Sequence, residues 1–193
     1  MNNPVRSHEN ARLIGLLARV SQGDKVAFSE LYRTLEKPLY GFICRKLNDS
    51  SEAHDVVNET FLEVWRRAGT FEGRSAVKSW VYAIGYRKAV DVIRKNARTV
   101  VSDDIPEVVD TDADAEACLL AAQSGEHVRY CIDRLKEDQA VAIRLAFFDD
   151  LSYREIAEIT DSPEGTIKTR VFHAKKALLH CLDGRISRQD IPS

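Results

Sequence analysis

Apolar residues recur every three or four positions along most of the chain, a spacing that places them on one face of a helix. Near the C-terminus, Ile167, Val171, Ala174 and Leu178 follow one another at intervals of four, three and four residues. Alternation of the strand type is absent from the sequence. The pattern predicts an all-α protein with helices over Leu13–Ser21, Ala27–Leu47, Ser51–Ala68, Ala76–Ala97, Glu126–Leu135, Gln139–Phe148, Tyr153–Thr160 and Pro163–Leu182.

Residues with turn and capping chemistry separate these helices. The segment GTFEGRS, residues 69–75, contains two glycines and is expected to be a loop. Ser51 and Ser162 stand where a side-chain oxygen can accept a hydrogen bond from the first free amides of a helix. Pro163 suits the first position of the last helix, where no amide donor is needed. Pro38 lies inside the second helix and is expected to kink or split it.

An acidic stretch divides the chain. Residues 99–125 contain seven acidic residues and no lysine or arginine, and the sequence TVVSDDIPEVVDTDADAEA shows no helical period. Like charges repel and keep such a segment extended. Without these seven residues the formal net charge of −2 becomes +5, so two basic modules are joined by an acidic strap. We expect two small helical domains, at residues 10–98 and 126–185, and a flexible acidic linker at residues 99–125.

The composition excludes several classes of protein. A hydrophobic content of 44% with 30% charged residues is typical of a globular protein, and no apolar run reaches the roughly 20 residues of a membrane span. Residues 1–10 are polar and do not resemble a secretion signal, so we expect a cytoplasmic protein without membrane insertion. The cysteines are far apart, with no CxxC pair or nearby histidine pair, which predicts buried thiols and no metal or cofactor: Cys44, Cys118, Cys131 and Cys181.

The two helices around Asp161-Ser162-Pro163 have the spacing of a helix-turn-helix, whose second helix enters the major groove of DNA. The side of the last helix opposite its apolar stripe presents Lys168, Thr169, Phe172, His173, Lys175 and Lys176. Lysine can bind guanine O6 and N7, and a threonine methyl or an aromatic ring can contact the thymine methyl. Spacing alone also fits a small helical bundle whose basic residues are merely solvated.

A second basic surface follows the helix from Ala76 to Arg98, with one acid, Asp91, among Lys78, Arg87, Lys88, Arg94, Lys95 and Arg98. Tyr82 and Tyr86 follow Lys78 on one stripe, and such rings can stack on unpaired bases while the cations follow the phosphates. The alternative is that these rings pack against neighbouring helices, with Trp80 in the core.

The helix from Ser51 to Ala68 has an acidic outer face. Asp55, Asn58, Glu59 and Glu63 lie opposite its apolar stripe, with Trp65 at the margin. Such a face repels DNA and suits a basic protein partner, although a solvated charged face would have the same composition.

Two segments carry a family resemblance. DVVNETFLEVWRRAGTFEGRSAVKSWVYAIGYRKAVDVIRK resembles region 2, and LKEDQAVAIRLAFFDDLSYREIAEITDSPEGTIKTRVFHAKKAL resembles region 4, of the extracytoplasmic-function (ECF) sigma factors in the sigma-70 family. The resemblance covers roughly residues 13–98 and 126–182. It implies a non-enzymatic subunit that directs core RNA polymerase to promoters.

The resemblance also implies roles for individual residues. Positions that bind the clamp helices of the polymerase β′ subunit match Asp55, Asn58, Glu59, Phe61 and Trp65. The loop that captures a flipped −10 base matches Phe71, Gly73, Arg74, Ser75 and Ala76. The rest of the −10 surface matches Lys78, Arg87, Lys88, Asp91, Arg94 and Lys95. The −35 reading face matches Lys168, Thr169, Phe172, His173 and Lys175.

Further partners implied by the resemblance are the β flap of the polymerase and an anti-sigma factor. The sequence departs from the family at Arg87, where relatives often have Asn, at Lys168, where several have Arg, and at His173, where Arg is frequent. Promoter sequence therefore does not transfer from relatives. A self-sufficient DNA-binding regulator is the alternative function, and an enzyme is disfavoured because the sequence contains no HExxH, P-loop or GxSxG motif.

Overall fold

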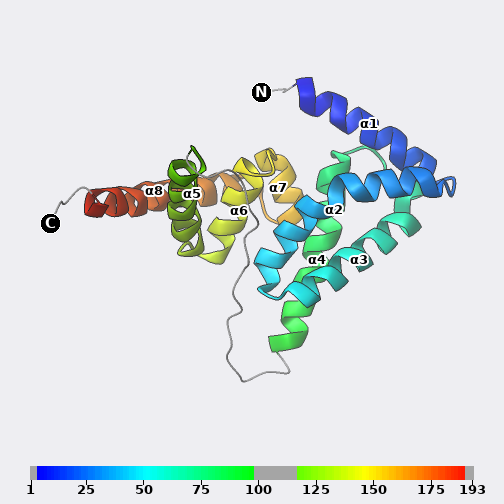
Figure 1. Cartoon of the computed structure of the whole chain (residues 1–193). Coiled ribbons are helices and arrows are strands. Elements are labelled where there is room, and N and C mark those ends of the chain that lie inside the picture. The colour runs from blue at the N-terminus through cyan, green and yellow to red at the C-terminus, as the bar shows by residue number, and fades with distance from the viewer. Residues whose placement is uncertain (1–3, 98–116, 190–193) are drawn as a thin grey trace. The chain divides into compact units, whose positions relative to one another are not determined.

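The computed structural model describes residues 4–97 and 117–189, and every regular element among them is a helix (Figure 1). The prediction of an all-α protein is confirmed. The elements are α1 (Pro4–Val20), α2 (Lys25–Leu47), α3 (Ser50–Arg67), the 3-10 turn η1 (Ala68–Thr70), α4 (Val77–Ala97), α5 (Ala117–Asp133), α6 (Glu137–Phe147), α7 (Tyr153–Thr160) and α8 (Glu164–Gln189). The chain forms two compact units, one built on α1–α4 and the other on α5, α6, α8 and most of α7. Residues 98–116, which include Arg98 and most of the predicted linker at 99–125, lie outside the described residues.

Helix α2 forms the centre of the first unit, where it packs against α1, α3 and α4. Its buried stripe meets the buried stripe of α3, and the fully buried members include Leu31, Leu39 and Phe61. Gly85 of α4 lets the three helices approach closely, because a Cβ at this position would lie 3.1 Å from Leu39 Cδ1. The core thus fixes α3 and α4 side by side, and these two helices carry most of the predicted site residues.

In this unit, a predicted split of one helix and the predicted cap of another were wrong. Helix α2 is not split at Pro38, because the ring lies on the exposed side of the helix, where water can satisfy the carbonyl that loses its amide partner. Helix α3 starts at Ser50, and its cap is Asp49 instead of Ser51: Asp49 Oδ1 accepts a hydrogen bond from the Glu52 amide at 2.9 Å.

The second unit is held together by contacts of α8 with α5 and α6. Helix α5 begins at Ala117, before the predicted start at Glu126, because the segment ACLLAAQ has high helix propensity despite its place next to the acidic stretch. A disulfide joins Cys131 of α5 to Cys181 of α8, with the two Cα atoms 5.9 Å apart. The prediction of thiols was therefore wrong at these two positions, while Cys44 is a half-buried free thiol.

Helix α7 occupies the predicted residues, and its start is a capping box. Ser152 Oγ accepts a hydrogen bond from the Glu155 amide at 3.3 Å, and the Glu155 carboxylate accepts one from the Ser152 amide at 2.8 Å. After α7 the chain turns at Asp161, whose left-handed backbone has a φ of 49°. Three residues thus connect α7 to α8, as the helix-turn-helix pattern predicts. No helix in the described part of the chain is long and apolar enough to span a membrane.

Candidate functional site

The predicted −35 residues all lie on the exposed side of α8. Ile167, Val171 and Ala174 are buried and turn one side of the helix to the core. The five predicted residues Lys168, Thr169, Phe172, His173 and Lys175 are exposed. Phe172 is 65% exposed, which is unusual for a large aromatic ring and indicates a contact surface.

Two side chains on this face are held by their own helix. Lys168 Nζ lies 2.8 Å from Glu164 Oε1, one turn earlier in α8. The Thr169 hydroxyl donates a hydrogen bond to the Gly165 carbonyl at 3.0 Å. The hydroxyl proton of Thr169 is therefore used within the helix, which leaves its methyl group and an oxygen lone pair for a partner. Lys168 must leave Glu164 before it can bind another acceptor.

Lys175 differs from the other members of the −35 set. Its ammonium group lies 4.8 Å from the centre of the Phe147 ring, at the C-terminal end of α6, so it is drawn to one edge of the exposed side. Lys176 is also exposed and, one helical step of about 100° further on, lies closer to the middle of the side opposite the core. The helical period of the sequence placed Lys176 on this outer face, but the −35 set implied by the family resemblance omitted it.

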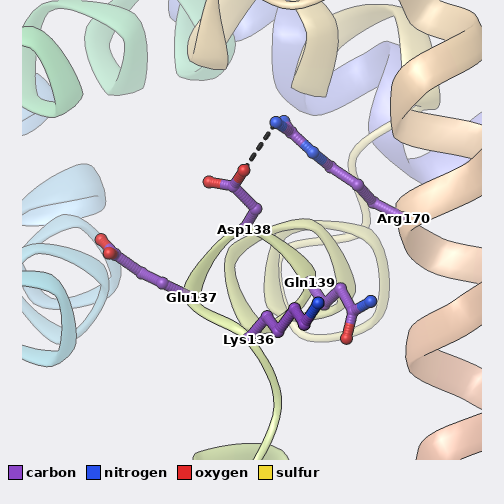
Figure 2. A pocket seen from close by; sticks show the side chains of 5 residues that line it. All are labelled: Lys136, Glu137, Asp138, Gln139 and Arg170. Carbon is purple, nitrogen blue, oxygen red and sulfur yellow. Dashed lines mark hydrogen bonds and ion pairs between the residues drawn. The ribbon is translucent and has the colours of Figure 1, made fainter.

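The turn and α8 are fastened to the start of α6 by Arg170. Its guanidinium lies 2.7 Å from Asp138 Oδ2 and donates a hydrogen bond to Ser162 Oγ at 3.1 Å. Figure 2 shows Asp138 and Arg170 facing each other across an open depression of about 470 Å³, which Lys136, Glu137 and Gln139 also line. The charges of Arg170 and Asp138 neutralise each other. We therefore interpret the depression as the site of a structural ion pair that sets the position of α8, and not as a binding site.

The predicted −10 cations of α4 separate into two groups. Lys88 Nζ lies 3.5 Å from Glu59 Oε2 of α3. Lys95 lines a groove of about 210 Å³ together with acidic residues of α3. Arg87 and Arg94 are exposed, and the Arg94 guanidinium lies 3.9 Å from Asp91, one turn earlier in α4. The charge available to DNA on α4 is therefore concentrated at Arg87 and Arg94, whereas the two lysines lie next to the acidic face.

The tyrosines of α4 form a row with Phe42 of α2. The Phe42 ring stacks on Tyr82 at 5.3 Å and on Tyr86 at 6.2 Å. Tyr82 is fully buried, so the prediction that its ring is available to unpaired bases was wrong, and the packing alternative holds. Lys78 lies 5.4 Å from the Tyr82 ring and Lys46 lies 5.2 Å from the Tyr86 ring. This places Lys46 of α2, which the sequence did not single out, beside the basic helix.

The loop between η1 and α4 contains the residues predicted to hold a flipped base. Phe71 packs edge-on against Trp80 of α4 with ring centres 5.4 Å apart. Trp80 is half-buried at the surface, so the expectation that it lies in the core was wrong. Gly73 adopts a φ of +70°, a region that favours glycine. Arg74 is exposed and pairs with Glu72. The loop therefore has one aromatic anchor and an exposed tip that carries the Arg74–Glu72 ion pair.

The acidic face of α3 is exposed at three of its five predicted positions. Asp55, Asn58 and Glu59 point away from the core. Trp65 is half-buried and packs edge-on against Phe28 of α2 at 5.1 Å. Phe61 is only 2% exposed, so its prediction as a direct contact was wrong: it belongs to the core beneath this face.

One apolar residue on this face was missed by the sequence interpretation. Leu62 is 54% exposed and lies one turn beyond Asn58 and Glu59 on α3. The face therefore combines carboxylates with an apolar contact, a composition that suits a protein partner better than DNA. The signal in the sequence was an aliphatic residue one position outside the buried stripe.

Comparison with known proteins agrees with this division into two units. Residues 31–99 match the family model for Sigma-70 region 2, and residues 126–178 match the model for Sigma-70, region 4. The chain is 32% identical over 189 residues to the ECF RNA polymerase sigma factor SigK of Mycobacterium tuberculosis, covering 95% of this chain and 99% of that protein. It is 32% identical over 173 residues to RNA polymerase sigma-H factor of Pseudomonas aeruginosa, covering 84% of this chain and 90% of that protein.

A solved structure supports the fold. The sigma factor RpoE of Bartonella quintana, determined in complex with the anti-sigma factor NepR, superposes with a TM-score of 0.64 at 23% identity and covers 81% of this chain and 96% of its own. The two units in this order define a sigma-70 type protein. The chain belongs to the ECF RNA polymerase sigma factors, which are transcription initiation factors without enzymatic activity.

Proposed function

We propose that this ECF sigma factor uses α8 to read the −35 element and α4 with its preceding loop to recognise the −10 element, while α3 binds core RNA polymerase. The observation that carries the proposal is the exposed side of α8. An aromatic ring that is 65% exposed lies there between lysines, on a helix whose other side is buried and whose start is fixed by a turn.

For the −35 element, the contacts come from Lys168, Thr169, Phe172 and His173, with Lys175 at the edge. Lys168 binds a base edge or a phosphate after leaving Glu164. The Thr169 methyl and the Phe172 ring supply apolar contacts of the kind that a thymine methyl accepts. His173 is exposed beside Phe172, with the ring centres 5.5 Å apart, and contacts a phosphate or a bound water.

For the −10 element, the loop from Phe71 to Ala76 receives one unpaired base of the non-template strand. Extruding a base from the stack costs a few kcal/mol, which a shaped and cationic site must return. Arg87 and Arg94 on α4 supply exposed positive charge near that strand, and Arg74 at the loop tip adds to it once it leaves Glu72. Lys78, Lys88 and Lys95 contribute less directly, because each lies against a ring or near an acid within the unit.

For the polymerase, α3 presents Asp55, Asn58 and Glu59 with Leu62 to a basic, partly apolar helix surface such as the β′ clamp helices. Trp65 supports the edge of this face, and Phe61 supports it from below. The second unit binds the β flap, and an acidic linker connects it to the first domain at residues 10–98. Because α5 begins at Ala117, this linker is shorter than the expected 99–125, and the second domain starts before residue 126. Control by an anti-sigma factor and a cytoplasmic location complete the proposal, and both follow from the family.

Reconstitution with core RNA polymerase tests this function. The full chain should direct core enzyme to a defined subset of promoters, which sequencing of transcript 5′ ends identifies. Asp55→Lys should weaken the binding of core enzyme without changing the melting temperature, because Asp55 is exposed. Glu126→Lys makes the same charge change at an exposed position of α5 and should leave core binding intact. Transcription that is identical with and without the protein would overturn the proposal.

A further inference from the structure

Helix α1 lies outside the residues matched by the region 2 model, which begins at residue 31. Its Asn10 nevertheless makes a specific contact with α4. Asn10 Oδ1 accepts a hydrogen bond from the Val77 amide at 2.9 Å, across 67 positions of sequence. Val77 is the first residue of α4, and the first amides of a helix have no partner within the helix.

Asn10 therefore caps α4 from another helix. A cap is normally supplied by the residue just before the helix, but here that residue is Ala76, whose methyl group accepts no hydrogen bond. Trp80 N donates to Ala76 O at 3.0 Å, which makes Ala76 the last residue before the first helical turn. A side chain at position 76 would accept from the second or third amide of the helix, whereas Asn10 satisfies the first, that of Val77.

The same helix also supports the other end of the loop. The turn η1 packs against α1, and the Ser21 side chain, just after α1, lies beside Gly69. Ala68, the first residue of η1, is buried. The loop from Phe71 to Ala76 thus follows a turn that packs against α1, and it ends at an amide that is hydrogen-bonded to α1.

We propose that α1 sets the conformation of the −10 recognition loop, with Asn10 as its positioning residue. This inference rests on the proposed function of the loop. A site that must hold an extruded base is effective only when its shape exists before the base arrives, because ordering the loop on binding would subtract from the affinity. Fixing both ends of a six-residue loop, Phe71 to Ala76, supplies that order without any contact between α1 and the DNA.

The test measures base discrimination by the full chain bound to core RNA polymerase. The probe is a fluorescent single-stranded oligonucleotide with the non-template −10 sequence of a promoter that the protein uses, compared with oligonucleotides carrying one abasic site at each position in turn. In the wild type, one abasic position should reduce the affinity most. Asn10→Ala should lower the affinity for the intact oligonucleotide about tenfold, which corresponds to about 1.4 kcal/mol. The ratio of the affinities for the intact and the abasic oligonucleotide at that position, here the discrimination ratio, should fall close to one.

Two further variants separate positioning from stability. Asn10→Asp keeps an oxygen that accepts from the Val77 amide, and its charge is favourable at a helix start, so it should retain the wild-type ratio. Asp49→Ala removes the ordinary N-cap of α3, whose Oδ1 accepts a hydrogen bond from the Glu52 amide at 2.9 Å. It should lower the melting temperature about as much as Asn10→Ala while keeping the ratio.

Each failure has a distinct reading. The role of Asn10 is overturned, while the proposed function stands, if Asn10→Ala has the same ratio of affinities for the intact and the abasic oligonucleotide as the wild type. The same conclusion follows if Asp49→Ala reduces this ratio as much as Asn10→Ala does. If the wild type with core enzyme shows no preferred base at any position, the function of the loop and the role of α1 fall together. All binding is measured well below the lowest melting temperature of the set, so that every variant is folded.

Discussion

Lys88 of α4 lies 3.5 Å from Glu59 of α3, which connects a residue predicted to bind DNA with a residue predicted to bind polymerase. Lys88 is the less exposed partner, with 27% of its side chain accessible, against 64% for Glu59. A lysine in this position neutralises part of the acidic face as well as adding charge to the basic helix. The two surfaces of the first unit therefore meet at this ion pair.

This arrangement predicts unequal effects for two α4 cations. Arg94→Ala should weaken promoter binding by the holoenzyme and reduce the slope of log K against log salt by about 1, because one phosphate contact is lost. Lys88→Ala should change that slope by much less, since Lys88 is paired within the unit. Fluorescence anisotropy at several salt concentrations measures both, and equal slopes for the two variants would contradict the division of the α4 cations.

A second prediction concerns the ion pair on the reading face of α8. Glu164→Gln removes the acid that holds Lys168 at 2.8 Å, and it also removes a negative charge near the DNA phosphates. An exposed ion pair of this kind is worth about 0.2–1 kcal/mol, so binding of a −35 duplex should tighten by about 1.4- to 5-fold. Glu126→Gln, an exposed position on α5, is the matched control and should have no effect. Titration of the duplex in low salt provides the measurement, and an unchanged affinity would show that Lys168 is not recruited from Glu164.

Lys168→Ala complements that experiment. If Lys168 binds a base edge, its loss should cost about 1–3 kcal/mol at the cognate −35 sequence and less at a sequence altered at the contacted base. A loss that is the same for every sequence would identify a phosphate contact instead. The ratio of affinities for the two duplexes decides between these outcomes.

Reduction of the Cys131–Cys181 disulfide should destabilise the second unit. The bond closes a segment of 50 residues and joins α5 to α8, and opening a native crosslink of this kind typically costs about 2–5 kcal/mol. Cys181→Ser, or the wild type with a reducing agent, should therefore unfold at a lower urea concentration. Cys44→Ser should behave like the wild type, because Cys44 does not take part in a disulfide. Equal stability of the oxidised and reduced wild type would contradict a structural role for this bond.

The sequence predicted the helices well because their apolar period is a local property. It was less informative wherever the outcome depended on contacts between distant parts of the chain. No spacing rule pairs Cys131 with Cys181, because the pairing follows from the packing of α5 against α8. The start of α1 at Pro4 was missed because its first turns are polar and carry no apolar stripe.

The candidate site divides in the same way. Which residues face outward on α8 follows from the helical repeat, and all five predicted residues there are exposed. On α4 the repeat correctly placed Lys78 beside Tyr82, but it could not show that the Tyr82 and Tyr86 rings stack on Phe42 of α2, because that contact joins two helices. Phe61 shows the limit of matching positions between families: a residue can align with a contact position and still be part of the core.

Gly73 offers a test of the loop that does not depend on charge. A Cβ at this position would meet nothing within 4 Å, so space permits alanine, but the backbone φ of +70° strains any other side chain. Gly73→Ala should cost about 1–2 kcal/mol if the loop keeps its conformation, or should reshape the loop. In either case the affinity for the single-stranded −10 oligonucleotide should fall while −35 duplex binding remains unchanged. Gly15→Ala in α1, where nothing lies within 4 Å and no positive φ is imposed, is the control and should be neutral or stabilising.

The start of α2 gives a prediction for acid stability. Asp24 accepts hydrogen bonds from the amides of Val26 and Ala27 and from Arg19, and these interactions, led by the Ala27 amide, hold the pKa of its carboxyl below the ordinary value of 3.8. A carboxyl with a lowered pKa in the folded state binds fewer protons than in the unfolded chain, so its contribution to stability is present above its ordinary pKa. That contribution is lost as the pH falls from 3.8 through the lower pKa of the folded state.

Asp24→Asn isolates this effect, because the amide oxygen can still accept from Val26 and Ala27 but does not titrate. Urea unfolding at several pH values should show the variant less stable than the wild type near neutral pH, by a difference that shrinks as the pH falls below 3.8. Asp49→Asn makes the same exchange of a capping carboxylate for an amide at the start of α3 and is the control. A difference between wild type and Asp24→Asn that stays constant across this range would mean that the stabilisation comes from the oxygen acceptor alone and owes nothing to the charge.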